Sequence, residues 1–375
     1  AEYDKEYQKY SPLKTQYDQI VQQITASDKA VAKHLNKGDY TKEDVFAIKT
    51  TDESLLRDVS VIKQTYGFGV GSIKETIEAI NNDLSQINER LTVNLNKDLK
   101  GRKTGDDPND FTQTTYGNNN VNPVKKEELH GTHVAGVIAA ERNNGKGMNG
   151  VANNVKIMAL RAVPNGDEYD KDIALAIKYA VDNGAKIINA SFGKYYSPHS
   201  DKVQEALVDA AQNDVLFVSS AGNEGLDLDK KSSYPNDHKN GSEIIDTYIS
   251  VGAINSKYGS NLVASYSNYG KKNVDVFAPG SQIYSPKPNN EYDFIDGTSF
   301  AAPAVSGVAA LIRSYYPKLT AAQVKQIIMD SGLSLPAKVT VPGSQNSVKS
   351  FGELSKSSNL VNAYNALIMA SKISN

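Results

Sequence analysis

The sequence predicts an α/β fold in which a doubly wound, mostly parallel sheet carries helices on both faces, with a helical segment ahead of it. From Glu128 onward, short apolar runs alternate with helical patterns, as in parallel sheets that are covered on both sides. Before residue 96, apolar residues instead recur every three or four positions, which is the spacing of amphipathic helices. In the sheet portion, right-handed crossovers gather loops at the carboxyl edge, where functional sites form.

Composition excludes several classes of protein and site. The 375 residues include 41 basic and 43 acidic side chains, well mixed, so the net charge of −2 gives no reason to expect nucleic acid or an anionic membrane as a partner. The chain has no cysteine, which excludes disulfides and thiolate metal sites. No apolar run approaches the roughly 20 residues of a membrane span. The sequence starts at Ala1 and shows no signal peptide, so we expect a processed N-terminus.

Residues 1–95 are predicted to form a helical accessory segment. Its helix-start signals are Ser11-Pro12, Thr41 with Asp44, Asp52 before Glu53, and Ser72 with Glu75. From Ile73 to Leu95 an apolar stripe repeats every three or four residues, as in coiled coils. The stripe has two interpretations: a helix that binds a partner protein, or an antiparallel helical hairpin that packs on itself. We favour the hairpin.

Residues 96–127 have the composition of a loop, rich in glycine, asparagine and aspartate. Asp106, Asp107 and Asp110 are candidate oxygen ligands for a calcium ion, although their spacing is not that of an EF-hand loop. The alternative, which we favour, is a polar surface loop with Asx turns.

The remainder, residues 96–375, is predicted to be the main domain. Its predicted strands are residues 155–160, 185–192, 215–219, 248–253 and 274–277. Its predicted helices are residues 134–140, 172–181, 203–212, 301–312 and 360–372.

The stretch Asp296-Gly297-Thr298-Ser299-Phe300-Ala301-Ala302-Pro303 leads into the most apolar of these helices. Pro303 suits the first turn of such a helix, so Ser299 is expected at a helix N-terminus, where backbone donors face a developing oxyanion. Taken alone, this stretch is better interpreted as a capping serine on a core helix. Two further motifs change that interpretation: His130-Gly131-Thr132-His133 upstream, and Ser220-Ala221-Gly222-Asn223-Glu224-Gly225 between the two.

These three motifs, in this order, resemble those of the subtilisin-like serine proteases, the subtilases. The resemblance covers the chain from about Glu128 to its C-terminus. It implies that Ser299 is the nucleophile, that His130 is its general base, and that Asn223 shares the oxyanion hole with the Ser299 backbone N–H. His133 is then interpreted as a core residue. The chemistry needs no cofactor, and a structural calcium ion would be typical of the family.

The same resemblance places the substrate. Ser191, Phe192 and Gly193 follow a predicted strand and correspond to one wall of the primary pocket, while Ser220, Ala221 and Gly222 correspond to the facing wall. Asp167, Glu168 and Tyr169 align with the segment that forms a second edge for an extended peptide. Glu224, next to Asn223, supplies a carboxylate that would pair with a basic side chain of the substrate.

The aspartate that a subtilase needs to orient its histidine has no recognisable motif in this sequence. Asp98 precedes His130 at a suitable distance but lacks the apolar strand and small residues of that motif. We therefore expect Ala1 to be a cleavage product. An upstream fragment carrying the aspartate and its strand would stay bound non-covalently, and residues 1–95 would be an insertion between the Asp and His motifs.

The sequence thus predicts a secreted or cell-surface bacterial serine endopeptidase, after removal of signal and pro-segments, that acts on proteins or peptides. Two alternatives belong to other classes. One is a catalytically inactive subtilase that serves as a binding module. The other is a helical interaction protein whose partner surface is residues 1–95.

Overall fold

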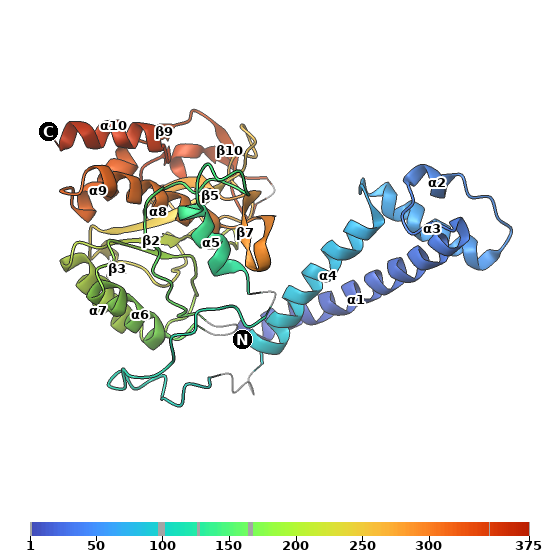
Figure 1. Cartoon of the computed structure of the whole chain (residues 1–375), viewed down its shortest axis with the longest axis horizontal. Coiled ribbons are helices and arrows are strands. Elements are labelled where there is room, and N and C mark those ends of the chain that lie inside the picture. The colour runs from blue at the N-terminus through green and yellow to red at the C-terminus, as the bar shows by residue number, and fades with distance from the viewer. Residues whose placement is uncertain (1, 97–101, 126–127, 164–167, 345, 375) are drawn as a thin grey trace. The chain divides into compact units, whose positions relative to one another are not determined.

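The computed structural model describes residues 2–96, 102–125, 128–163, 168–344 and 346–374. These fall into two compact units, one made of the described residues up to Lys103 and the other of those from Thr104 onward. Figure 1 shows both units, coloured from blue at the N-terminus to red at the C-terminus.

The regular secondary structure described in the first unit is all helical. Its helices are α1 (Glu2–Leu35), α2 (Lys42–Phe46), α3 (Glu53–Gly67) and α4 (Ile73–Glu89), which continues as a π-helical turn, Arg90–Asn94. Two of the predicted starts are confirmed by their caps. Thr41 and Asp44 form a reciprocal capping box, and Asp52 accepts from the first-turn amides of α3. The start predicted at Pro12 is wrong, because α1 begins earlier and runs through this proline.

The helices of this unit pack on one another. α1 contacts both α3 and α4, and Arg90 at the end of α4 hydrogen-bonds Glu6 near the start of α1 at 3.1 Å, so these two helices run antiparallel. The core between the helices is a set of buried apolar side chains: Ile24, Val31, Val45, Val59, Ile62, Tyr66 and Ile73. This is the self-packing hairpin that the apolar stripe favours.

The second unit is built on a six-stranded sheet. In spatial order its strands are β1 (Ile187–Ala190), β2 (Leu216–Ser220), β5 (Tyr248–Ile254), β6 (Val276–Pro279), β12 (Asn359–Leu360) and β9 (Leu333–Ser334). All neighbouring pairs are parallel except the last, β12 with β9. The mostly parallel sheet is therefore confirmed.

Helices cover both faces of this sheet (Figure 1). One face packs against α8 (Thr298–Tyr315), α9 (Ala321–Asp330) and α10 (Ala363–Ile373), and the other packs against α6 (Asp170–Asp182) and α7 (Ser200–Gln212). Successive side chains of a strand point to opposite faces of the sheet, so one strand contributes to the core on both faces. In β2, Leu216 and Val218 face α8, whereas Phe217 faces α6 and α7.

Smaller elements complete the unit. α5 (His130–Ala139) packs against α8 and against the hairpin of β7 (Ile283–Lys287) and β8 (Glu291–Ile295), which leads directly into α8. Two further antiparallel pairs are β3 (His238–Lys239) with β4 (Ser242–Glu243), and β10 (Lys338–Thr340) with β11 (Val348–Ser350). Short 3₁₀ turns span Pro288–Asn290 and Phe351–Glu353. None of the helices described here is long and apolar enough to cross a membrane.

One predicted strand is wrong. Residues 155–160 adopt no regular secondary structure, and Ile157, Met158 and Leu160 expose 47%, 41% and 38% of their surface. Such an apolar run becomes a strand only when a neighbouring strand satisfies its backbone and covers its side chains. The structure also leaves β1 at the edge of the sheet, paired with β2 alone among the described strands.

Candidate active site

The two histidines of the His motif lie one turn apart on α5, in different surroundings. Both rings pack against Phe300 of α8, with ring centroids 5.6 Å from His130 and 4.6 Å from His133. His133 is fully buried, and its Nε2 is hydrogen-bonded with the carbonyl of Ile283 at 3.0 Å. His130 is exposed. Only His130 is therefore placed where a substrate can reach its imidazole.

The imidazole of His130 packs against Phe300 and forms no hydrogen bond with any described residue. Loss of water where it packs against the protein, and secondly repulsion from His133, hold the pKa of His130 below its usual value. Among the described residues, no carboxylate and no hydroxyl, including that of Ser299, forms a hydrogen bond with this ring. A neutral imidazole is a competent base, but nothing in the described part of the chain selects its tautomer.

Ser299 is the second residue of α8. Its backbone N–H belongs to the first helical turn, where amides lack an intrahelical acceptor and point toward any bound anion. Its Oγ donates a long hydrogen bond of 3.3 Å to the carbonyl of Ser191, at the end of β1. The hydroxyl thus rests at the carboxyl edge of the sheet, beside the segment predicted to form one wall of the substrate pocket.

Pro303 links this serine to the sheet. The prediction that Pro303 occupies the first turn is wrong, because α8 begins at Thr298 and the proline is its sixth residue. Without an N–H, Pro303 leaves the carbonyl of Ser299 without its helical donor. Ser191 Oγ donates to that carbonyl at 2.7 Å and itself accepts from Asn189 Nδ2 at 2.9 Å. The helix break is therefore compensated by a contact that holds Ser299 to the end of β1.

Asn223 lies after β2, with its side-chain amide oriented by Thr298. Both the backbone N–H and the Oγ1 of Thr298 donate to Asn223 Oδ1 at 2.9 Å. Thr298 Oγ1 also accepts from the N–H of Gly222 at 3.1 Å, which fixes the loop to the helix. Oδ1 is thus held by two donors, while Nδ2 forms no hydrogen bond with any described residue. Sequence reasoning missed the role of Thr298, since no spacing rule connects it to Asn223.

The two predicted walls of the primary pocket are neighbours. β1 and β2 pair in parallel with Ala190 opposite Ser219, so Ser191–Gly193 and Ser220–Gly222 both emerge at the same edge of the sheet. Ser191 and Ala221 are buried, whereas Phe192 and Gly222 are partly exposed. Parallel pairing alone thus brings together segments that are separated in the sequence.

The predicted second edge is only partly described. Glu168 and Tyr169 lie just before α6, and Asp167 lies outside the described residues. The carbonyl of Glu168 accepts a hydrogen bond from Lys194 Nζ. Lys194 directly follows Gly193, so this contact connects the second edge to the first wall. Lys194 also forms an ion pair with Asp170 at 2.8 Å, which anchors it to the start of α6.

The carboxylate of Glu224 is held in place beside Asn223. Its Oε2 accepts from the hydroxyl of Tyr195 and, at 2.9 Å, from the backbone N–H of Asn223. Asn268 supports the arrangement, because its Nδ2 donates to the Tyr195 hydroxyl at 2.8 Å and its Oδ1 accepts from the N–H of Glu224 at 3.2 Å. Tyr195 and Asn268 gave no signal in the sequence, because both act only through residues distant along the chain.

The three aspartates proposed for calcium do not gather around a common point. Asp106 forms an ion pair of 2.6 Å with Lys171, which is completely buried. Asp107 accepts from the N–H of Asn109 at 2.9 Å, and Asp110 accepts from Thr112 at 2.6 Å and 2.9 Å, as in Asx turns. Within the described ranges, no cluster of three acidic or histidine side chains is arranged to hold a metal ion. Structural calcium stays a prediction.

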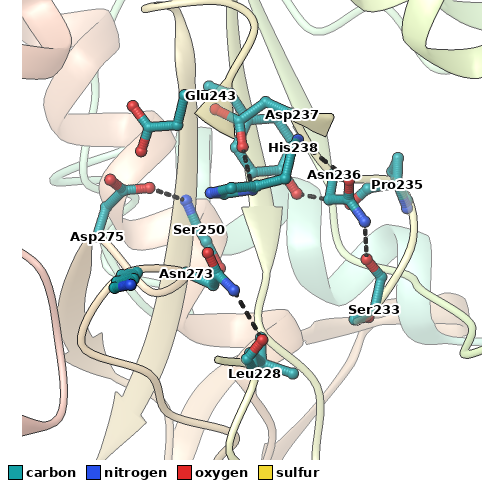
Figure 2. Close-up of polar contacts among 12 residues, drawn as sticks. Leu228, Ser233, Pro235, Asn236, Asp237, His238, Glu243, Ser250, Asn273 and Asp275 are labelled. Atoms are coloured by element: carbon teal, nitrogen blue, oxygen red, sulfur yellow. Dashed lines mark hydrogen bonds and ion pairs between the residues drawn. The ribbon is translucent and has the colours of Figure 1, made fainter. Parts of the chain in front are cut away.

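The closest histidine–carboxylate pair in the described structure lies at the opposite end of the parallel strands from Ser299. His238 Nδ1 lies 2.9 Å from Asp237 Oδ1, with Glu243 and Asp275 nearby (Figure 2). Asp275 immediately precedes β6, and its carboxylate accepts from the N–H of Ser250 at the start of β5. This cluster therefore lies at the amino ends of the parallel strands, and Ser299 lies at their carboxyl ends. Asp98 lies outside the described residues.

Comparisons with known proteins agree with this geometry. The sequence profile of the subtilase family matches residues 52–353. The chain is 42% identical over 187 residues to a thermophilic serine proteinase of Bacillus sp. (strain AK1), which covers 49% of this chain and 42% of the relative. It is 36% identical over 208 residues to subtilisin DY of Bacillus licheniformis, which covers 55% of this chain and 71% of subtilisin DY.

A third relative is the cell wall-associated protease of Bacillus subtilis (strain 168). It is 35% identical to this chain over 235 residues, which cover 62% of this chain and 23% of the relative. The chain thus spans less than half the length of two of these relatives. Among solved structures, a protease from Pseudoalteromonas arctica PAMC 21717 superimposes with a TM-score of 0.52 at 31% identity, over 64% of this chain and 70% of that one. From the extent of the profile match and the arrangement of His130, Asn223 and Ser299, we conclude that this chain belongs to the subtilase family.

Proposed function

We propose that the protein is a serine endopeptidase. The observation that carries the proposal is the orientation of Asn223 by Thr298 beside the N-terminus of α8. His130 takes the proton of Ser299 Oγ as this oxygen attacks the peptide carbonyl. The resulting oxyanion accepts hydrogen bonds from Asn223 Nδ2 and the Ser299 N–H, and His130 then passes its proton to the leaving amine. Water, activated by His130, hydrolyses the acyl-enzyme.

The catalytic aspartate would come from outside these 375 residues. Three observations on the described residues support this part of the proposal: none of their carboxylates pairs with His130, none of their strands covers the outer edge of β1, and residues 155–160 are largely apolar, exposed and in no strand. One parallel strand placed between β1 and residues 155–160 would satisfy the backbone groups of both. Its carboxyl end would reach the edge where Ser299 lies, so an aspartate there would be within range of His130.

This strand would belong to an upstream fragment that is cleaved but remains bound, with the helices of residues 1–95 as an insertion between the two motifs. Because this chain has no cysteine, the attachment would be non-covalent or through the polypeptide itself. Mass spectrometry of active material, before and after addition of denaturant, distinguishes a non-covalently bound fragment from a continuous polypeptide. A shorter polypeptide released only by denaturant supports the cleaved fragment. Full activity of the 375-residue chain alone would contradict an external aspartate.

The nucleophile is tested by labelling with a fluorophosphonate, which phosphonylates activated serines with loss of fluoride. The protein with its upstream segment should be labelled on Ser299, and the Ser299→Ala variant should not. Ser314, an exposed serine near the end of α8, provides the matched control, because Ser314→Ala removes a hydroxyl from the same helix without touching the nucleophile. Labelling that persists in Ser299→Ala would show that the nucleophile is wrongly assigned.

One observation favours a second candidate function. His130 and Ser299 share no hydrogen bond in the described structure, as expected of an inactive subtilase that binds peptides without cleaving them. The same labelling experiment separates the two. If the protein with its upstream segment binds peptides but is not labelled, the binding function is correct.

The substrate would be a protein or peptide that lies as an added strand between Ser191–Gly193 and the segment containing Glu168 and Tyr169. As the name of one relative is that of a cell wall-associated protease, we further propose a secreted or cell-surface location. Fractionation of the source cells, with an antibody against the second unit, tests this location.

A further inference from the structure

A cavity of mixed polarity lies close to the catalytic serine, on the side away from the predicted primary pocket. It has a volume of about 380 Å³, and most of its lining side chains carry hydroxyl or amide groups, with Val263, Val341 and Pro342 as the apolar part of the wall. Asn255 follows β5, Ser281 and Gln282 follow β6, and Thr340 ends β10. Asp296, which also lines the cavity, lies only three residues before Ser299. The cavity thus opens at the carboxyl ends of β5 and β6.

The walls of this cavity are built by fixed contacts. The N–H of Thr340 donates to the carbonyl of Ser260 at 2.8 Å, which ties β10 to the loop after β5. Asn255 Nδ2 donates to the carbonyl of Asn261 at 2.8 Å, closing that loop. The Tyr266 hydroxyl donates to the carbonyl of Gly280 at 2.8 Å, just ahead of Ser281. The cavity is therefore preformed rather than opened by a ligand.

Asp296 presents a fixed carboxylate to this cavity. Its Oδ1 accepts from the backbone N–H of Gln282 at 2.5 Å and from Gln282 Nε2 at 3.2 Å. Gln282 has a φ of 54°, a left-handed conformation that is uncommon for glutamine and that aims its N–H at Asp296. Both bonds go to Oδ1. The exposed side chain thus keeps its second oxygen, Oδ2, available to a cation.

The order of strands gives the position of the cavity along a bound peptide. The predicted walls of the primary pocket follow β1 and β2, so the acyl side of the substrate lies there and the leaving side passes toward β5 and β6. Strands are about 4.8 Å apart, so β6 lies on the order of 10 Å beyond β2. An extended peptide covers this distance in about three residues, at roughly 3.3 Å each.

We propose that this cavity is a specificity site that receives a lysine or arginine side chain two or three residues after the scissile bond. Asp296 pairs with the cationic group, and the amide and hydroxyl oxygens of the wall accept its remaining hydrogens. The inference rests on the proposed endopeptidase function. Lys257 carries the opposite charge on the same lining and is exposed, so it opposes the preference without abolishing it.

The first test compares cleavage of quenched peptides that differ only at the second and third leaving-side residues, lysine against methionine. The enzyme with its upstream segment should favour lysine in kcat/KM by about three- to fivefold, the scale of an exposed ion pair. In Asp296→Asn the ratio should fall to about one, and in Lys257→Met it should rise. Glu291→Gln removes another exposed carboxylate from the β7–β8 hairpin and should leave the ratio unchanged.

The second test needs no catalysis. Calorimetric binding of leaving-side product peptides to Ser299→Ala should favour the lysine peptide, and the added Asp296→Asn change should remove that difference. Equal binding of lysine and methionine peptides would overturn the specificity site even if cleavage is normal. Conversely, a preference in binding without cleavage or labelling would leave the site intact and overturn the endopeptidase function.

Discussion

The hydroxyl of Ser191 donates to the carbonyl oxygen of Ser299 across 2.7 Å, and it does so in place of the helical N–H that Pro303 lacks. A helix-breaking residue thus creates the acceptor that joins the nucleophile to the end of β1. Ser306 Oγ extends the connection, because it donates at 2.9 Å to Asn189, the residue that in turn donates to Ser191. The position of Ser299 therefore depends on polar contacts between α8 and the sheet.

We expect Ser191→Ala to lower the free energy of unfolding by about 1–3 kcal/mol, because it leaves a carbonyl near the buried core without a donor. kcat should fall together with stability, since Ser299 loses its anchor. The addition of Pro303→Ala restores an N–H for that carbonyl, so the double variant should be more stable than the sum of the two single effects. Urea unfolding of all four proteins measures this cycle, and strictly additive effects would contradict the proposed exchange of donors.

Asn223→Ala should lower kcat about 100- to 1,000-fold while changing KM little, because the amide acts on the oxyanion and not on the bound peptide. Thr298→Val keeps the backbone donor to Asn223 but removes the hydroxyl donor, so its effect on kcat should have the same direction and be smaller. Steady-state kinetics on one peptide gives both values. A rise in KM with unchanged kcat would show that Asn223 binds the substrate in its ground state.

Glu224 should contribute to cleavage after basic residues, whereas Phe192 and Ala221 should permit large apolar ones. Its carboxylate is held by Tyr195, so a substrate cation would join an existing contact instead of ordering a free side chain. We expect Glu224→Gln to reduce kcat/KM for substrates with lysine before the scissile bond and to leave those with leucine unchanged. If lysine substrates are cleaved unchanged, Glu224 does not determine this preference.

The pKa of His130 should rise when the aspartate-bearing strand is present. Desolvation and His133 lower this pKa in the chain by itself, and a carboxylate beside the ring would stabilise the imidazolium. The pH above which labelling of Ser299 becomes fast should therefore move upward with the strand bound. NMR titration of the histidine Cε1–H signals measures this, with the buried His133 as the internal control. A pKa of His130 that does not change would place the strand elsewhere.

Stability should depend on pH through His238. The hydrogen bond that His238 donates to the Asp237 carboxylate raises the pKa of His238, with smaller contributions from Glu243 and Asp275, and burial partly opposes the shift. Because the folded pKa is raised, the stabilisation is complete below the unfolded value of about 6.5 and is lost as the pH rises through the folded pKa. The thermal unfolding midpoint of the wild type should therefore decrease as the pH rises from the unfolded to the folded pKa of His238. His238→Gln should lack this slope, and an equal slope in both proteins would assign it to other groups.

Much of the local structure could be predicted because its causes are local. The caps at Thr41 and Asp52 satisfy amides within three residues, and the continuous apolar runs of β2 and β5 are typical of strands that are buried on both faces. The exceptions are instructive. Pro12 and Pro303 both lie inside helices, and for Pro303 a donor from another element replaces the lost hydrogen bond.

The sequence by itself determined the alternation of strands and helices, the helical character of residues 1–95, and the three motifs that contain His130, Asn223 and Ser299. Only the tertiary structure decided that Thr298 orients Asn223, that Ser191 holds Ser299, and that Asp296 borders a cavity. It also decided that residues 155–160 are not a strand. The reason is the same in each case: a hydrogen-bond partner or a covering strand comes from a distant part of the chain, and no local pattern encodes its position.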